Sequence, residues 1–271
     1  MFLLILPIAL SAAILVQLFH ESIHALTALL IGAKIDYVSF YAIETSWPIA
    51  GIDMIPFREA LIAGSAAIFN ILLAVICIAL FYKIKNPSQR LFVFYLGAYS
   101  LFLGFGYLLI DPLRASPDSL GDWAKVVMFL GGSWTIRLLV FLIGGIGTVY
   151  GYFWTGSAAQ YFNYEEKQKM FNYKRLGVML CLLPYIIINS ILTVIAFAQN
   201  SEGAFFALFL YWGAYLGLFW AFMIKFVWSK YEGHFQDETY IPDRTTFWPL
   251  LIAMILILLV VFILGPGITM H

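Results

Sequence analysis

The chain has 271 residues, of which 63% are hydrophobic, 18% aromatic and only 11% charged, and its mean hydropathy is +0.91. A water-soluble domain is roughly half apolar and about a quarter charged, so this chain has too little polar surface to cover itself in water. Fifteen basic residues balance fifteen acidic ones, which excludes the strongly basic surface of a nucleic-acid-binding protein. The composition predicts an integral membrane protein surrounded by a lipid bilayer.

Seven apolar segments approach or exceed the length that crosses a bilayer as a helix, about 20 residues. They comprise residues 3–32, 58–82, 91–110, 134–158, 176–198, 204–228 and 247–266. Because backbone polar groups must be paired in lipid, and the segments lack the alternation of barrel strands, we expect helices. The predicted fold class is an all-α polytopic membrane protein with about seven transmembrane helices plus a re-entrant half-helix.

Basic residues in two loops predict the orientation in the membrane. The second and fourth loops carry them: Lys83, Lys85, Arg90, Lys167, Lys169, Lys174 and Arg175. Cytoplasmic loops are enriched in lysine and arginine, so we expect both loops, and the N-terminus, to lie inside. The expected location is a plasma (inner) membrane, which the chain crosses several times.

Residues 111–132 differ from the other connections. They open with the Asp111-Pro112 pair, carry Asp118 and Asp122, and include a short apolar piece at 123–130. This piece is too short to span, so it predicts a loop followed by a half-helix. Irregular backbone at membrane depth is tolerated only where protein buries it or water reaches it.

The first apolar segment contains His20, Glu21 and His24 in the HExxH pattern. Residues four apart share one face of a helix, so both imidazoles can bind one metal ion. Zinc lowers the pKa of bound water to about 7, and Glu21 is then the general base that accepts its proton. A metal-free packed cluster is the alternative. Three ionisable groups in lipid cost several kcal/mol if unpaired, which favours the metal.

A catalytic zinc site usually has three protein ligands, so one more is expected. His234 lies in a late loop and His271 is the last residue, and we expect neither to reach the membrane interior. The better candidates are the acidic residues of the irregular segment, Asp111, Asp118 and Asp122.

Taken together, these features resemble the site-2 protease (M50) family of intramembrane metalloproteases. That family has HExxH in one span, a following span with a small-residue motif ending in asparagine, and a later Asp-Gly that begins a helix. Residues 63–70 (AGSAAIFN) resemble the second element, with Ser65 where the family often has proline. Asp122 and Trp123 stand where the family has Asp-Gly. The resemblance covers residues 15–132.

The resemblance implies a zinc metalloendopeptidase that cuts another membrane protein in or next to a transmembrane segment. It implies Zn²⁺ bound by His20, His24 and Asp122, with Asp111 as runner-up for the third ligand and Asp118 next. A helix N-terminus also favours a carboxylate at position 122. Asn70 would contact substrate or orient a ligand. Its alternative role is a plain helix–helix hydrogen bond.

The same features predict the domain organisation. We expect residues 1–132 to form the catalytic core and residues 133–271 to form accessory helices. Polar residues within spans gather in the first half, so we expect the last three spans to serve packing. Glycines between 144 and 156 predict close packing of the fourth span. Residues 33–57 are aromatic; a β-element is one interpretation, and we favour an interfacial aromatic belt.

Two other function classes stay open. A non-catalytic binding or chaperone-like relative would have no chemical need for Glu21. A proton or metal-ion transporter would use the same intramembrane cluster, but it would place polar residues in several spans or show an internal repeat. Neither the substrate nor the oligomeric state is indicated by the sequence.

Overall fold

The computed structural model describes residues 2–47, 55–116, 121–162, 177–199, 208, 211–213, 215–219, 247–264 and 267–269. This part of the chain is mostly helical. Five helical segments in it are long and apolar enough to cross a membrane: α1 (Phe2–Leu30), α2 (Ile55–Phe81), α3 (Pro87–Arg114), α5 (Trp134–Ala159) and the π-helix η3 (Val178–Leu182) that continues into α7 (Leu183–Gln199).

The predicted number of seven spans is not confirmed. Most of the sixth predicted span, residues 204–228, lies outside the described residues. The seventh corresponds to α10 (Phe247–Leu259) followed by the π-helix η4 (Val260–Leu264), which is not among the five long apolar helices. The basic residues of the fourth loop, Lys167, Lys169, Lys174 and Arg175, also lie outside the described residues.

The third predicted span was too short. Helix α3 continues past residue 110 through the Asp111-Pro112 pair and ends at Arg114. A proline removes one backbone hydrogen bond, and tightly packed neighbours in a membrane protein compensate for that loss. The half-helix predicted after this span is α4 (Asp122–Phe129), which begins at Asp122.

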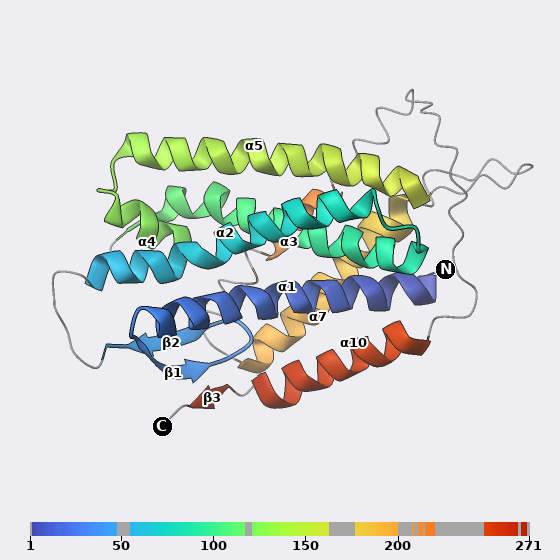
Figure 1. Cartoon of the computed structure of the whole chain (residues 1–271), viewed down its shortest axis with the longest axis horizontal. Helices are drawn as coiled ribbons and strands as arrows, with labels where there is room; N and C mark the ends of the chain where they lie inside the picture. Colours follow the sequence, from blue (N-terminus) through green and yellow to red (C-terminus); the bar gives the residue numbers. More distant parts are fainter. Residues whose placement is uncertain are drawn as a thin grey trace, which may run out of the picture.

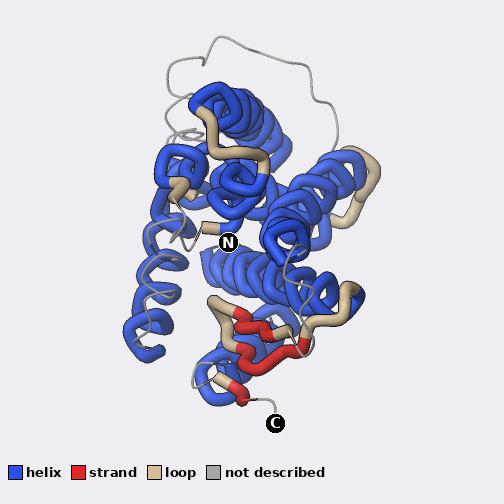
Figure 2. Tube along the Cα trace, turned by 90° about the vertical axis from the view of Figure 1, so that its left-hand side faces the viewer, coloured by secondary structure: helices blue, strands red, loops and turns tan. Residues whose placement is uncertain are grey.

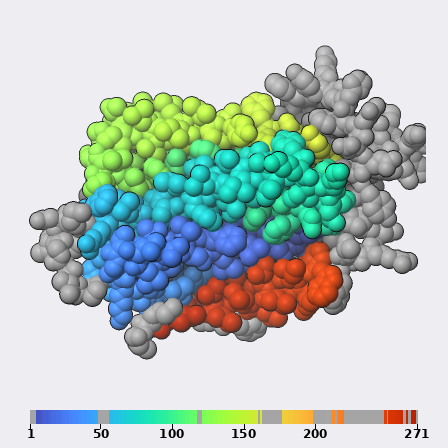
Figure 3. Space-filling model, viewed as in Figure 1, coloured from blue at the N-terminus to red at the C-terminus, as the bar shows by residue number. Residues whose placement is uncertain are grey.

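The long helices run side by side, as Figure 1 shows. Helix α3 packs against α1, α2 and α5, and α4 packs against α2 and α3. Helices α7 and α10 pack on α1, and on the face drawn in Figure 3 the surfaces of α5, α2, α1 and α10 follow one another. The helices beyond residue 132 therefore pack directly against the predicted core.

Glycines allow the close contact of α5 with α3, as predicted. A methyl group at Gly144 would lie 2.6 Å from the backbone carbonyl carbon of Leu108, and one at Gly147 would collide with the ring of Phe105. Gly64 on α2 allows close approach of α4, because a methyl group at this position would lie 3.1 Å from the Val126 side chain.

A small sheet lies beside the C-terminal end of α1, and Figure 2 shows its strands in red. Strands β1 (Lys34–Val38) and β2 (Ile43–Ser46) form an antiparallel hairpin, and β3 (Ile268–Thr269) pairs with the other edge of β1. The β-element interpretation of residues 33–57 is thus the correct one, and the fold is helical with a three-stranded sheet added.

Candidate metal centre

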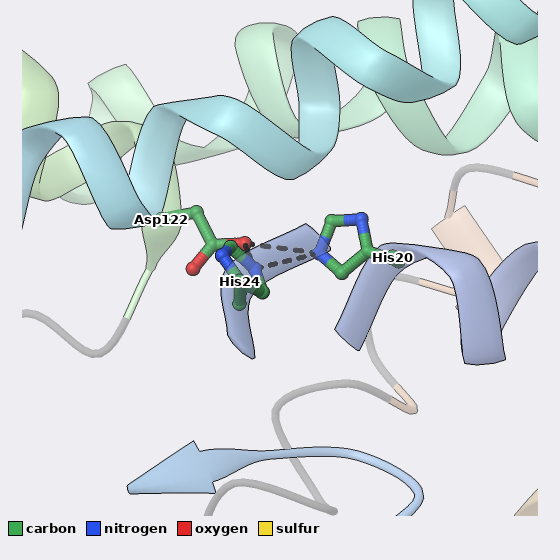
Figure 4. A group of neighbouring side chains, drawn as sticks. All are labelled: His20, His24 and Asp122. Carbon is green, nitrogen blue, oxygen red and sulfur yellow. Dashed lines mark hydrogen bonds and ion pairs between the residues drawn. The ribbon is translucent and has the colours of Figure 1, made fainter. Parts of the chain in front are cut away.

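Helices α1 and α4 bring three ligand-type side chains to one point. His20 and His24 are one helical turn apart on α1, and Asp122 is the first residue of α4 (Figure 4). The Oδ2 atom of Asp122 lies 3.1 Å from Nε2 of His20 and 3.2 Å from Nε2 of His24. The two Nε2 atoms are 3.2 Å apart. The three atoms form a nearly equilateral triangle.

The triangle has the size that a small cation requires. Zinc binds histidine nitrogen and carboxylate oxygen at about 2.0–2.1 Å, so tetrahedral ligand atoms lie about 3.3 Å from one another. A single proton can join two of the three atoms, whereas a cation contacts all three. The residues present therefore fit a metal with three protein ligands and one open position.

Helix α2 fixes the ring of His24. Its Nδ1 atom lies 2.7 Å from the backbone carbonyl oxygen of Ile62. A carbonyl only accepts, so Nδ1 carries the hydrogen, and in the neutral ring the Nε2 lone pair faces the other two candidate ligand atoms. Metal-binding histidines commonly donate their second N–H in this way.

Asn70, also on α2, holds the other imidazole. Its amide nitrogen lies 2.9 Å from Nδ1 of His20, while its Oδ1 atom is buried without a hydrogen bond. The two ends of an amide are interchangeable in shape. With the amide turned over, Oδ1 accepts from Nδ1–H of His20 and the amide NH2 takes the position of the unpaired oxygen. Nε2 of His20 is then free to bind a cation.

Glu21 faces the same interior and is held by Gln17. The Nε2 group of Gln17 donates to Oε1 of Glu21 at 2.7 Å and to the backbone carbonyl of Phe40 at 3.2 Å. Phe40 belongs to the hairpin turn between β1 and β2. One amide therefore ties the predicted general base to the sheet.

Asp111, the runner-up ligand, lies next to the three-residue group and outside it. Its Oδ2 atom accepts a hydrogen bond from the backbone N–H of Trp123 at 2.9 Å. A methyl group at Gly121 would lie 2.8 Å from the Asp111 carboxyl carbon. Asp111 thus stabilises the first turn of α4 through its contacts with Gly121 and Trp123. Asp118, His234 and His271 fall outside the described residues.

The group is buried and opens on one side. His20 is 1% exposed and His24 7%, whereas the side chain of Asp122 is 21% exposed. The ring of Tyr107 on α3 stacks on His20, with the centroids 4.9 Å apart and the planes at 9°. We did not single out Tyr107 or Ile62 in the sequence, because an apolar segment gives no sign of which residue meets a histidine from another helix.

Comparisons with family models, with curated proteins and with solved structures find no match for this chain. The likeness to the site-2 protease family thus rests on the motifs in residues 15–132 alone.

Proposed function

We propose that the chain is a zinc-dependent endopeptidase of the site-2 protease type, which hydrolyses peptide bonds in or next to the transmembrane segments of other membrane proteins. The observation that carries the proposal is the convergence of two Nε2 atoms and one carboxylate oxygen within 3.2 Å of one another. Each imidazole is also held at its far nitrogen by α2.

The roles of the side chains follow from their positions. His20, His24 and Asp122 would hold the ion, which when bound makes water acidic enough to attack at neutral pH and polarises a carbonyl group. Glu21 would accept the proton of that water and return it to the leaving amine. Gln17 keeps one carboxylate oxygen of Glu21 in place, so the other oxygen is left for the proton.

Transport is the competing use of such a cluster, and the arrangement favours hydrolysis. The three ligand atoms close around one point rather than following one another across the membrane. Glu21 stands beside that point and is not among the group that could share an ion. Hydrolysis needs a base beside the ligands, and Glu21 is in that position.

The test is a cleavage assay with matched enzymes. Purified wild type and Glu21→Gln would be mixed in bicelles with single-span peptides that carry glycine or proline near mid-span, and mass spectrometry would locate new termini. We expect cleavage by the wild type and none by Glu21→Gln, although both bind about one zinc per chain. Equal cleavage by the two, or none by zinc-loaded wild type across the peptide set, would contradict the proposal.

A further inference from the structure

A row of buried tyrosines runs through the interior beside the candidate metal centre. Going along the row, the ring centroids of Tyr41 and Tyr211 are 5.8 Å apart, those of Tyr211 and Tyr215 5.3 Å, those of Tyr215 and Tyr99 4.5 Å, and those of Tyr99 and Tyr95 5.9 Å. None of the five is more than 6% exposed. The row joins the hairpin turn to the middle of α3.

The hydroxyl groups of the row fall into two kinds. At the two ends they are paired, because Tyr41 donates to the carbonyl of Leu192 at 2.6 Å and Tyr95 to that of Leu180 at 2.8 Å. In the middle, the hydroxyls of Tyr99, Tyr211 and Tyr215 are fully buried and have no hydrogen-bond partner among the residues that the structure describes. Within this part of the chain, three consecutive phenols thus have buried hydroxyl groups that no protein group pairs.

Asn189 on α7 adds to this set. It is completely buried, and its amide nitrogen and oxygen both lack a hydrogen-bond partner within the described part of the chain. It shares a face of the helix with Leu192, which receives the Tyr41 hydroxyl, and with Tyr185, whose hydroxyl donates to the carbonyl of Trp212. This corrects the expectation that polar residues within spans lie in the first half alone.

Burial of these three hydroxyls and the Asn189 amide without hydrogen bonds would destabilise the protein. A buried polar group without a partner destabilises a protein by about 1–3 kcal/mol, and an amide offers four hydrogen-bonding positions. Buried polar groups that lack protein partners are usually satisfied by internal water. We propose that Tyr99, Asn189, Tyr211 and Tyr215 enclose a pocket of ordered water between α3, α7 and residues 211–215.

Two ring contacts and two hydrogen bonds link the pocket to Glu21, the proposed general base. Tyr211 contacts Tyr41, Tyr41 packs on Phe40 with centroids 4.7 Å apart, and the Phe40 carbonyl accepts from the Gln17 amide that also holds Glu21. Hydrolysis consumes one water per peptide bond, its OH going to the carbonyl carbon and its hydrogen to the amine. The pocket supplies that water, a part of the inference that rests on the proposed function.

Radiolytic hydroxyl-radical labelling tests the hydration itself, because X-rays generate the radicals from bound water in place. Phe94 is the control, since it is equally buried, has no polar atom in its own side chain and packs on Phe81 and Phe162. We expect Tyr99, Tyr211 and Tyr215 to be labelled about tenfold faster than Phe94. Labelling of the three tyrosines no faster than Phe94 would overturn the pocket.

Asn189→Leu tests the supply of water. We expect it to lower labelling of the three tyrosines and to lower kcat about tenfold, with zinc content and KM unchanged. Unchanged kcat in a variant whose labelling is lost would overturn the supply role. Because labelling requires no proteolysis, failure of the pocket and failure of the proposed function give different results.

Discussion

The carboxylate of Asp111 accepts a hydrogen bond from the backbone N–H of Trp123 at 2.9 Å, directly next to Asp122 in the chain. Asp111 therefore fixes α4, the helix that carries Asp122. Close contact with Gly121 reinforces this, since any side chain at 121 would strike the Asp111 carboxyl group. The position of Asp122 toward His20 and His24 depends on this anchor.

Removing the anchor is expected to weaken metal binding indirectly. Asp111→Ala leaves the Trp123 N–H without its acceptor, which should cost about 1 kcal/mol of stability, as loss of a helix cap does. Zinc affinity should fall with it, because α4 is no longer held. Chelator competition and detergent unfolding followed by circular dichroism measure both. Asp111→Asn keeps an acceptor oxygen and should retain most of both properties; equal damage by the two variants would contradict the anchor role.

Asn70→Ala should lower zinc affinity about 10- to 100-fold, the usual effect of losing a group that orients a histidine ligand. Asn70→Asp keeps an acceptor for Nδ1–H of His20 and serves as the control. Competition with a chelator of known affinity gives the numbers. A loss of about 0.6 kcal/mol in unfolding free energy with unchanged zinc affinity would instead identify Asn70 as a helix–helix contact only.

Gln17→Leu should lower kcat about tenfold at unchanged zinc content, because the proposed general base, Glu21, loses the donor that orients it while the proposed ligands stay in place. Steady-state assays measure kcat, and elemental analysis measures the zinc content. Loss of zinc in this variant would show that Gln17 supports the ligands and not the base.

Gly144 and Gly145 offer a matched pair for the α3–α5 contact. A methyl group at 144 would meet the backbone of α3, whereas one at 145 has its nearest neighbour at 3.7 Å, in the Leu109 side chain. Gly144→Ala should destabilise the protein by about 1–3 kcal/mol and Gly145→Ala by less than about 0.5 kcal/mol. Unfolding in mixed detergent compares them, and equal effects would contradict the packing.

The convergence of His20, His24 and Asp122 could be predicted from the sequence because its geometry is partly local. His20 and His24 share a helix face by spacing alone, and Asp122 was distinguished by its place at the start of a short helix. The groups behind them were not predictable. Tyr107 and the Ile62 carbonyl meet the histidines through packing between helices, and spans that are apolar on all sides do not show which face meets a neighbour.

Two local sequence signals led to wrong predictions, each for a physical reason of its own. The Asp111-Pro112 pair reads as a helix end in water, yet close neighbours let α3 continue to Arg114. Residues 33–47 have an aromatic composition that suits both a membrane interface and a hairpin. The third strand, Ile268–Thr269, comes from the far end of the chain, and no local pattern predicts such a pairing.

Metal content tests the central claim most directly. Elemental analysis would compare detergent-purified wild type with His20→Ala, Asp122→Asn and Asp111→Asn, each confirmed to be folded by circular dichroism. The account predicts about one zinc per chain in the wild type and in Asp111→Asn, and none in His20→Ala or Asp122→Asn. Folded wild type without stoichiometric metal, or with iron in place of zinc, would contradict it, as would zinc retained in Asp122→Asn but lost in Asp111→Asn.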